Sequence, residues 1–431
     1  MKSVNRQHPL LFRLVIAHYL LAAVCFVAIA IMLQFVSEDL NGHYFQPKLL
    51  AITHTAALGW GSLMIFGACY QLLPVVLETE LYSYKIAWLS FGLFCTGLVL
   101  FVCAFWNFDP GLCMQAGSIL LLAGILLFAW NTFITSSRTE KHSIYQDFIT
   151  TACIWLLATA ILGTLMVFNF RFPFLPKDHL LFLKLHAHMG IGGWFLLLII
   201  GVSSKLIPMF LVSTKQNTAC LSWSYYLINA ALVSFLVDTY LYGVNMKTYI
   251  VAVAAIAGVI CWLIFIAQCV KSRMRKAFDM PVMHTFLSFF LLTLSLVALP
   301  FIVFYQIKGD GLSVKSTNIY GTLVFMGWIS AIILGQTFKT LPFIVWIKRY
   351  QHLAGKETTP LPADLFSKRL LSVQFYIFLV FNAGFYAGLF FHSDILLKLS
   401  LLWFLLTAVI YLLNVLIVIL HKSKTKVYGN F

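Results

Sequence analysis

Two histidines, His186 and His188, stand two residues apart in the stretch LHAHMGIGGWFLLLIIGVSSKLIP (185–208), and His54 opens the stretch HTAALGWGSLMIFGACYQLLP (54–74). Both stretches are apolar enough to lie in a lipid bilayer, where an imidazole is costly and often serves a function. Imidazole is the usual axial ligand of haem iron and a common ligand of copper. The alternative for each residue is a histidine that hydrogen-bonds between helices.

The spacing of His186 and His188 separates their roles. Two residues on a helix differ by about 200° in direction, so both rings cannot bind one ion without local distortion. His186 shares its face with Gly190 and Gly193, a strip of small residues against which a planar group or another helix could lie. His188 is expected to point toward a neighbouring span, so the two imidazoles are predicted to have different partners.

The composition places these histidines in a membrane protein. Of the 431 residues, 61% are hydrophobic and 10% are charged, which a soluble domain of this length cannot accommodate. The apolar runs are continuous and close to the roughly 20 residues that a membrane helix needs, which excludes barrel strands. The sequence therefore predicts an all-α membrane protein, a single transmembrane domain over residues 1–431. We expect twelve spans, at about 10–36, 48–75, 82–106, 114–136, 147–170, 181–211, 220–242, 248–270, 281–305, 316–346, 368–391 and 395–421.

An internal repeat relates three of these spans. The segments 54–74, 188–208 and 322–342 align without a gap, and each copy begins 134 residues after the one before. In each, Gly-Trp is followed by Gly seven residues after the Trp and by Pro fourteen after it: Gly59, Trp60, Gly67 and Pro74; Gly193, Trp194, Gly201 and Pro208; Gly327, Trp328, Gly335 and Pro342. The repeat predicts three four-helix units at about 1–140, 141–276 and 277–431. Its glycines suit close helix packing or the approach of a flat ligand.

The repeat also orders the candidate ligands. His54 and His188 occupy the same repeat position, whose third copy is Thr322, and Tyr320 takes the place of His186. We therefore take three histidines as candidate metal ligands and add the aromatic residues near them as candidate cofactor contacts. The metal candidates are His54, His186 and His188, and the cofactor candidates are these three with Trp60, Trp194 and Tyr320.

The basic residues predict the orientation. Positive loops stay on the cytoplasmic side, so a net charge of +15 is an orientation signal with possible contact to anionic membrane lipid. The chain carries no aromatic-basic patch that would suit nucleic acid. We expect both termini in the cytoplasm and a retained first span that begins at Leu10. The basic loops and tail contain Lys271, Arg273, Arg275, Lys276, Lys348, Arg349, Lys368, Arg369, Lys422, Lys424 and Lys426.

Two further lysines, Lys205 and Lys339, follow the repeated Trp by eleven residues, on the same helix face and near the cytoplasmic ends. Either they extend to the inner headgroups, or they serve in proton or anion uptake.

The chain resembles subunit I of the haem-copper oxidase superfamily in three features. These are twelve helices in three units, a histidine of span 2 in the pattern His-x5-Trp-Gly, and a span 6 that carries histidines. The stretch 54–74 is most similar to span 2 of the nitric oxide reductases and C-type oxidases. This resemblance implies that His54 ligates a low-spin haem and that His186 or His188 ligates a copper ion. It also implies a bacterial inner membrane and a respiratory or redox partner protein.

The chain departs from that family in its ligands. The family also uses histidines of spans 7 and 10, and the corresponding segments here, SWSYYLINAALVSFLVDTYLYG and NIYGTLVFMGWISAIILGQTFKTLPF, contain none. The usual two haems and one copper cannot be held in the family's manner. The H-x-H pair of residues 186–188 is similar to that of the NnrS-type membrane proteins, which are associated with the nitric oxide response.

We therefore expect a haem-binding or copper-binding membrane protein that acts in respiratory redox chemistry or nitric oxide handling. If it is an enzyme, it is an oxidoreductase with an unusual ligand set. We expect a b-type haem, and covalent attachment is not expected because the chain lacks the Cys-x-x-Cys-His motif. Two alternatives stay open: a transporter of copper, another metal or a small solute, and a cofactor-free structural subunit of a membrane complex. The position of the carboxylates at span ends or in loops disfavours ion-coupled transport.

Overall fold

The computed structural model describes residues 9–214, 217–274, 277–309 and 311–422. These residues form helices and connecting loops, with no β-strand among them. Twelve of the helical spans are long and apolar enough to cross a membrane, which confirms the all-α membrane class and the twelve predicted spans. Of the basic residues named above, Arg275, Lys276, Lys424 and Lys426 lie outside the described residues.

Nine of the twelve described spans are uninterrupted α-helices, and the other three contain a π-helical segment. The nine are α1 (Pro9–Phe35), α4 (Tyr84–Asn107), α5 (Leu112–Ser137), α6 (Ile144–Arg171), α9 (Thr218–Tyr242), α10 (Thr248–Lys271), α11 (Met280–Lys308), α14 (Lys368–Phe391) and α15 (Asp394–Ile419). The three are α2 (Pro47–His54) with α3 (Leu63–Val76), α7 (His179–His188) with α8 (Leu197–Leu211), and α12 (Leu312–Thr322) with α13 (Ser330–Tyr350). Short 3-10 turns at Asp39–Asn41 and Pro362–Asp364 lie in the loops.

The π-helical segments recur at the predicted repeat interval. They cover Thr55–Ser62, Met189–Leu196 and Leu323–Ile329, so each begins 134 residues after the one before. π-Helical turns are uncommon and often lie at functional sites. Here they immediately follow His54, His188 and Thr322. The recurrence supports the sequence repeat, while the division into three four-helix domains stays a prediction.

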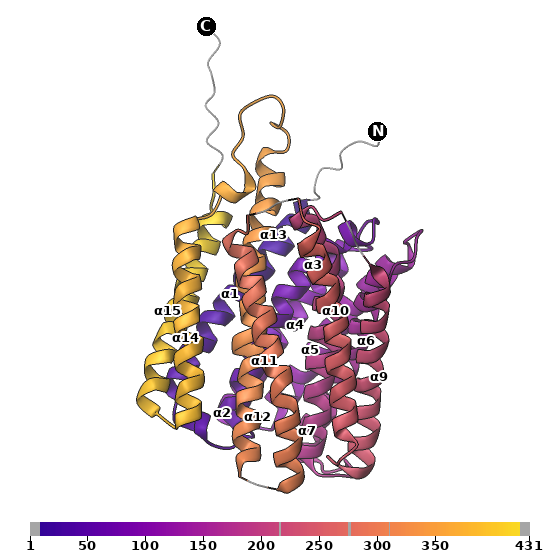
Figure 1. Ribbon diagram of the computed structural model, residues 1–431, viewed down its shortest axis with the longest axis vertical. Coiled ribbons are helices and arrows are strands. Elements are labelled where there is room, and N and C mark those ends of the chain that lie inside the picture. The colour runs from indigo at the N-terminus through magenta and orange to yellow at the C-terminus, as the bar shows by residue number, and fades with distance from the viewer. Residues whose placement is uncertain (1–8, 215–216, 275–276, 310, 423–431) are drawn as a thin grey trace.

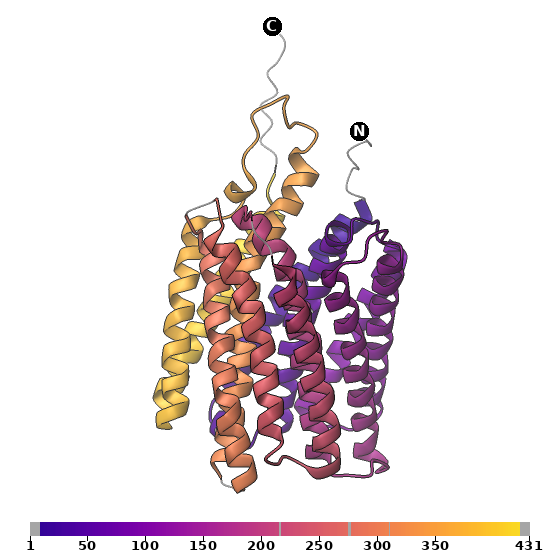
Figure 2. The same ribbon diagram turned by 45° about the vertical axis from the view of Figure 1, so that its right-hand side comes forward.

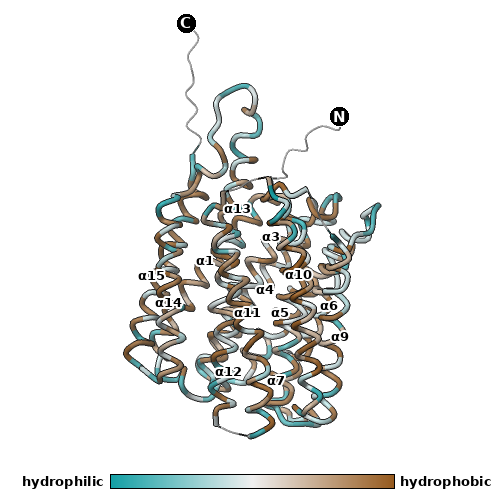
Figure 3. Tube along the Cα trace, in the orientation of Figure 1, coloured by the Kyte–Doolittle hydropathy of each residue, from teal (hydrophilic) through white to brown (hydrophobic). Residues whose placement is uncertain are grey.

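The three repeat spans form the centre of the bundle. Spans 2, 6 and 10 have 72%, 78% and 67% of their most apolar window buried, more than any of the other nine described spans. The helices run side by side (Figures 1 and 2), and α2, α7 and α12 lie at the end opposite the start of α1 and the end of α15 (Figure 1). Apolar residues lie along the length of the spans, and hydrophilic residues lie at the ends of the spans and in the long loop after α13 (Figure 3). The central spans therefore position any buried site.

Polar caps fix where several spans begin. Ser83, Ser143 and Ser367 each accept a hydrogen bond from the backbone N–H three residues later, at the starts of α4, α6 and α14. Asp178 accepts from Leu180 N and Leu181 N and begins α7. These caps satisfy N–H groups that the first helical turn leaves free. Asp178 thereby sets the start of the helix that carries His186.

The second repeated glycine serves helix packing. A Cβ built at Gly67 would lie 2.6 Å from the Cβ of His18, and one at Gly335 would lie 2.6 Å from the Cβ of His284. The glycine of the middle copy, Gly201, meets Phe148 in the same way. The preceding span therefore crosses each central span at a point where only glycine fits. His18 and His284 are fully buried at two of these crossings.

Candidate functional site

His54, the last residue of α2, is held firmly within its own helix. Its Nδ1 donates a hydrogen bond to the carbonyl oxygen of Leu50, at 2.7 Å. Because a carbonyl oxygen only accepts, the proton is on Nδ1 and the lone pair is on Nε2. The ring stacks on Phe105 with centroids 5.1 Å apart and an interplanar angle of 11°, and it meets the ring of Phe101 edge-on, also at 5.1 Å. These contacts leave Nε2 as a fixed electron-pair donor.

His186, in α7, is held by a different span. Its Nδ1 donates to the carbonyl oxygen of Thr159 in α6, at 3.0 Å. The same reasoning leaves the lone pair on Nε2. Gly163, one turn further along α6, provides the space for this ring, since a Cβ there would lie 2.8 Å from Cε1 of His186. A histidine whose Nδ1 is bound to a backbone carbonyl is the usual arrangement of a metal-ligating imidazole.

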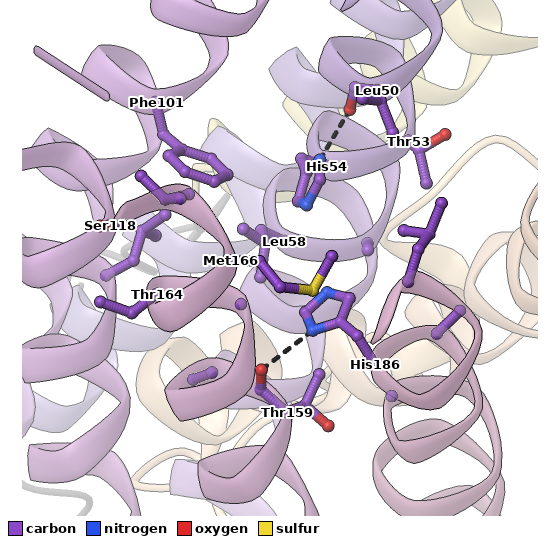
Figure 4. A pocket seen from close by; sticks show the side chains of 18 of the residues that line it. Leu50, Thr53, His54, Leu58, Phe101, Ser118, Thr159, Thr164, Met166 and His186 are labelled. Carbon is purple, nitrogen blue, oxygen red and sulfur yellow. Dashed lines mark hydrogen bonds between the residues drawn. The ribbon is translucent and has the colours of Figure 1, made fainter. Parts of the chain in front are cut away.

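The two imidazoles face each other across a cavity. Their ring centroids are 6.4 Å apart with an interplanar angle of 37°, and their second nitrogens are directed toward one another (Figure 4). A metal–imidazole bond is about 2.0 Å long and the ring centroid lies about 1.1 Å beyond the nitrogen, so two imidazoles on opposite sides of one metal have centroids about 6 Å apart. The spacing of His54 and His186 therefore fits a single metal centre held between them.

The cavity between these rings has a volume of about 180 Å³. One water molecule needs about 10–15 Å³ on this scale, so the cavity can take part of a much larger ligand. Its lining is largely apolar and includes several small residues that leave flat space beside the histidines. These residues are Ala57, Ala160, Gly163, Ala187 and Gly190. Its lining also includes Phe45, His179, Trp194 and Phe325.

The described residues contain no group of three or more His, Cys, Asp or Glu side chains that could hold a metal ion together. His54 and His186 are the two imidazoles that face each other here, whereas the third imidazole of the lining, His179, stacks on Phe170 with centroids 4.4 Å apart. Met166 also lines the cavity and carries a thioether sulfur, a weaker donor. A metal centre here needs most of its other ligands from a cofactor.

His188 lies elsewhere, as the 200° separation predicts. Its Nδ1 donates to the carbonyl oxygen of Lys184, at 2.8 Å, and its ring lies beside Phe235 and Tyr320. The centroid distance to Tyr320 is 6.1 Å with an interplanar angle of 15°. His188 does not line the cavity between His54 and His186. The sequence grouped His54 with His188, whereas in space His54 pairs with His186 and His188 pairs with Tyr320.

The two candidate tryptophans differ in position. Trp194 lines the cavity, whereas Trp60 does not. Trp60 is buried, stacks on Phe26 with centroids 4.3 Å apart, and donates from Nε1 to Ser330 Oγ at 3.1 Å. Gly193, expected on the face of His186, packs against Trp155, since a Cβ there would lie 2.4 Å from that ring. Trp60 and Gly193 therefore serve packing, and Gly190 faces the cavity.

Several site residues carry no signal in the sequence. Phe105 and Phe101 on α4, and Thr159 and Gly163 on α6, belong to spans without a motif, and Thr159 acts through its backbone. The only related clue is that a membrane histidine needs a partner for its second nitrogen. Which span supplies that partner depends on helix packing.

No protein-family model matches the chain. Among curated proteins, the chain is similar to a cytochrome c oxidase subunit 1 homolog from Azorhizobium caulinodans, with 33% identity over 120 residues. The match covers 21% of this chain, and the chain spans only 22% of that relative's length. The similarity links one segment of this twelve-span membrane protein to an oxidase subunit.

Proposed function

We propose that this membrane protein binds one b-type haem between His54 and His186 and acts in respiratory redox chemistry. The observation that carries the proposal is the pair of opposed imidazoles, with centroids 6.4 Å apart and each Nδ1 bound to a backbone carbonyl. Haem iron commonly takes a histidine as axial ligand. The partial similarity to an oxidase subunit supports the same cofactor class.

The number of protein ligands favours haem over a bare copper ion. A structural or catalytic ion without a cofactor usually takes three or four side chains. A porphyrin supplies four nitrogens of its own, so a haem would need only two ligands from the protein. His54 and His186 are two such ligands, on opposite sides of an apolar cavity.

The chain would contribute ligands, orientation and exclusion of water. The Leu50 and Thr159 carbonyls hold each imidazole in the tautomer with Nε2 free, and they raise the basicity of that nitrogen. Phe105 keeps the plane of the His54 ring fixed. The apolar lining keeps water from the cavity, which also influences the reduction potential. When bound, the haem would supply one-electron chemistry.

The proposed pair of haem ligands differs in one respect from the pair that the oxidase family uses. The oxidase family completes its low-spin haem with a histidine of span 10, and span 10 of this chain has none. Span 6 supplies the second imidazole in this proposal. We propose a relative of the haem-copper oxidases that keeps the twelve-span bundle and holds its haem with a different second span. Its electron donor would be a redox partner protein.

Optical spectra of the purified protein, oxidised and reduced with dithionite, test the proposal. We expect a Soret band and sharp reduced α-bands typical of a six-coordinate haem, with about one haem per chain by the pyridine haemochrome assay. His54→Ala should remove most of the haem, because it deletes the better-held ligand. His188→Gln is the matched control and should keep the spectrum, since His188 lies outside the cavity.

A colourless protein, isolated from cells supplied with haem precursors and folded by its circular dichroism, would contradict the proposal. A haem spectrum lost in His188→Gln and kept in His54→Ala would move the site to the His188 and Tyr320 pair.

A further inference from the structure

The two imidazoles of the cavity are held to different degrees. The His54 ring is bound to a carbonyl of its own helix and contacts two aromatic rings, Phe105 and Phe101. Its Leu50 partner lies four residues earlier in the same α2 helix, so the bond does not depend on how two helices pack. His54 cannot leave its position without breaking contacts within α2 and with α4.

The His186 ring depends on another helix. Its hydrogen-bond acceptor is Thr159 in α6, 27 residues earlier in the chain. Among the described residues, the ring that lies against His186 is that of His54 itself. The cavity on this side is lined by small side chains, including Gly163 and Ala160 of α6 and Gly190 of its own span, and by Met166. The cavity also lies directly beside the ring. The attachment of the His186 ring therefore depends on how α7 packs against α6, whereas that of His54 lies largely within its own helix.

We infer that His186 is an exchangeable ligand: it yields its place to a diatomic gas, while His54 stays bound. This inference rests on the proposed haem between the two residues. In the exchange, His186 Nε2 would give up its bond to the haem and the gas molecule would take that place, with no change in the number of electrons. The Thr159 carbonyl can release the ring and recapture it.

The nature of the cavity selects the incoming ligand. The position left by His186 would be bordered by the largely apolar lining of the cavity. A charged ligand would lose its hydration there without a compensating partner. A small neutral molecule such as carbon monoxide, nitric oxide or dioxygen loses little. The site would thus bind a gas only after an internal ligand departs.

Carbon monoxide binding to the dithionite-reduced protein, followed by stopped-flow absorbance, tests the exchange. If His186 must leave first, the observed rate levels off with rising carbon monoxide concentration, at the rate of ring departure. In His186→Ala, the oxidised spectrum should become high-spin, and the rate should rise linearly without a plateau, by about tenfold or more. These readouts are spectroscopic and need no enzyme assay.

Two paired variants separate the ligands. Gly163→Ala places a methyl group 2.8 Å from Cε1 of His186, which displaces that ring, so the plateau should rise by about tenfold. Phe105→Leu loosens the His54 ring instead and should leave the plateau unchanged. Met166→Leu is the control for thioether ligation. It should leave both the wild-type spectrum and the His186→Ala spectrum unchanged.

Three results would overturn the inference while leaving the proposed haem intact. The reduced haem protein fails to bind carbon monoxide, or His186→Ala keeps the wild-type spectrum, or Phe105→Leu raises the plateau and Gly163→Ala does not. The last result would identify His54 as the ligand that leaves. Absence of any Soret band is a different outcome, because it removes the proposed function itself.

Discussion

Trp194 donates a hydrogen bond from Nε1 to Ser62 Oγ at 3.0 Å, and this joins the centre of span 6 to the centre of span 2. Trp60 donates in the same way to Ser330, at 3.1 Å, which joins span 2 to span 10. The third tryptophan, Trp328, has no such partner, because the residue at the corresponding repeat position is Leu196. Two of the three repeated tryptophans therefore hydrogen-bond to a serine of another central span.

Ser62→Ala should destabilise the bundle by about 1–3 kcal/mol. Ser62 accepts from Trp194 and also donates to the Ala57 carbonyl, five residues earlier, within the π-helical segment. The alanine variant leaves a buried indole N–H unpaired and removes the side-chain donor at that carbonyl. Reversible unfolding in mixed micelles, monitored by circular dichroism, measures the change. Ser222→Ala, on an exposed face of α9, is the control and should fall within about 0.5 kcal/mol of the parent. Equal effects for the two variants would refute the structural role of Ser62.

The effect of replacing a glycine by alanine on stability should depend on the space around that glycine. A Cβ at Gly335 would lie 2.6 Å from both the His284 Cβ and the Pro281 carbonyl oxygen, so Gly335→Ala must push span 9 away from span 10. We expect a cost of about 1–3 kcal/mol. Gly92, inside α4, has no atom within 4 Å of a built Cβ, and Gly92→Ala should be neutral or stabilising by up to about 1 kcal/mol. A loss of stability in both variants, measured in the same micelles, would show that helix contact at Gly335 is not the cause.

The orientation of the bundle is open to direct measurement. The described chain begins at α1 and ends after α15 at the same end of the bundle (Figure 1), and basic residues such as Lys348 and Arg349 lie toward that end. By the positive-inside rule this end should face the cytoplasm. Alkaline phosphatase fused after Gly111, in the loop between α4 and α5, should be active, and a fusion after Lys422 inactive. The reverse pattern would place the His54 cavity on the cytoplasmic half.

The class of fold was predictable because it depends on composition and on the length of apolar runs, which require no knowledge of packing. The residues of the π-helical segments were also marked in advance by the Gly-Trp repeat, although their helix type was not. Ser62, for example, bonds five residues back, and no sequence pattern distinguishes this from the ordinary bond to the fourth residue.

The pairing of His54 with His186 was not predictable from the repeat. The repeat relates His54 to His188 as equivalent positions, and equivalent positions on different units face different neighbours. The residue that each histidine contacts lies in the next repeat unit, two positions before the histidine's own repeat equivalent. His54 contacts His186, two residues before His188, and His188 contacts Tyr320, two residues before Thr322. A sequence shows which residues correspond, while which of them meet depends on how the central helices turn toward one another.

Lys339 pairs with Asp279, and this pair distinguishes a structural role of the repeated lysine from a role in proton or anion uptake. Lys339 Nζ lies 2.5 Å from Asp279 Oδ2, with the lysine side chain 12% exposed and the aspartate 32%. Asp279 also accepts a hydrogen bond from Val282 N at the start of α11. The contact ties span 10 to the first turn of span 9, so a structural role is expected for both residues.

Asp279→Ala should cost about 2–4 kcal/mol, because it removes a helix cap and leaves a largely buried ammonium without this carboxylate. Lys339→Met should cost less, since methionine keeps the apolar stem and the aspartate is partly hydrated. In the double variant, the two losses should fall short of their sum by about 1–3 kcal/mol. Unfolding in mixed micelles measures all three variants, and Lys368→Met with Asp364→Ala, an exposed pair, is the control cycle with a coupling below about 1 kcal/mol. Additive losses at Lys339 and Asp279 would exclude the structural pair and favour the alternative role of Lys339 in proton or anion uptake.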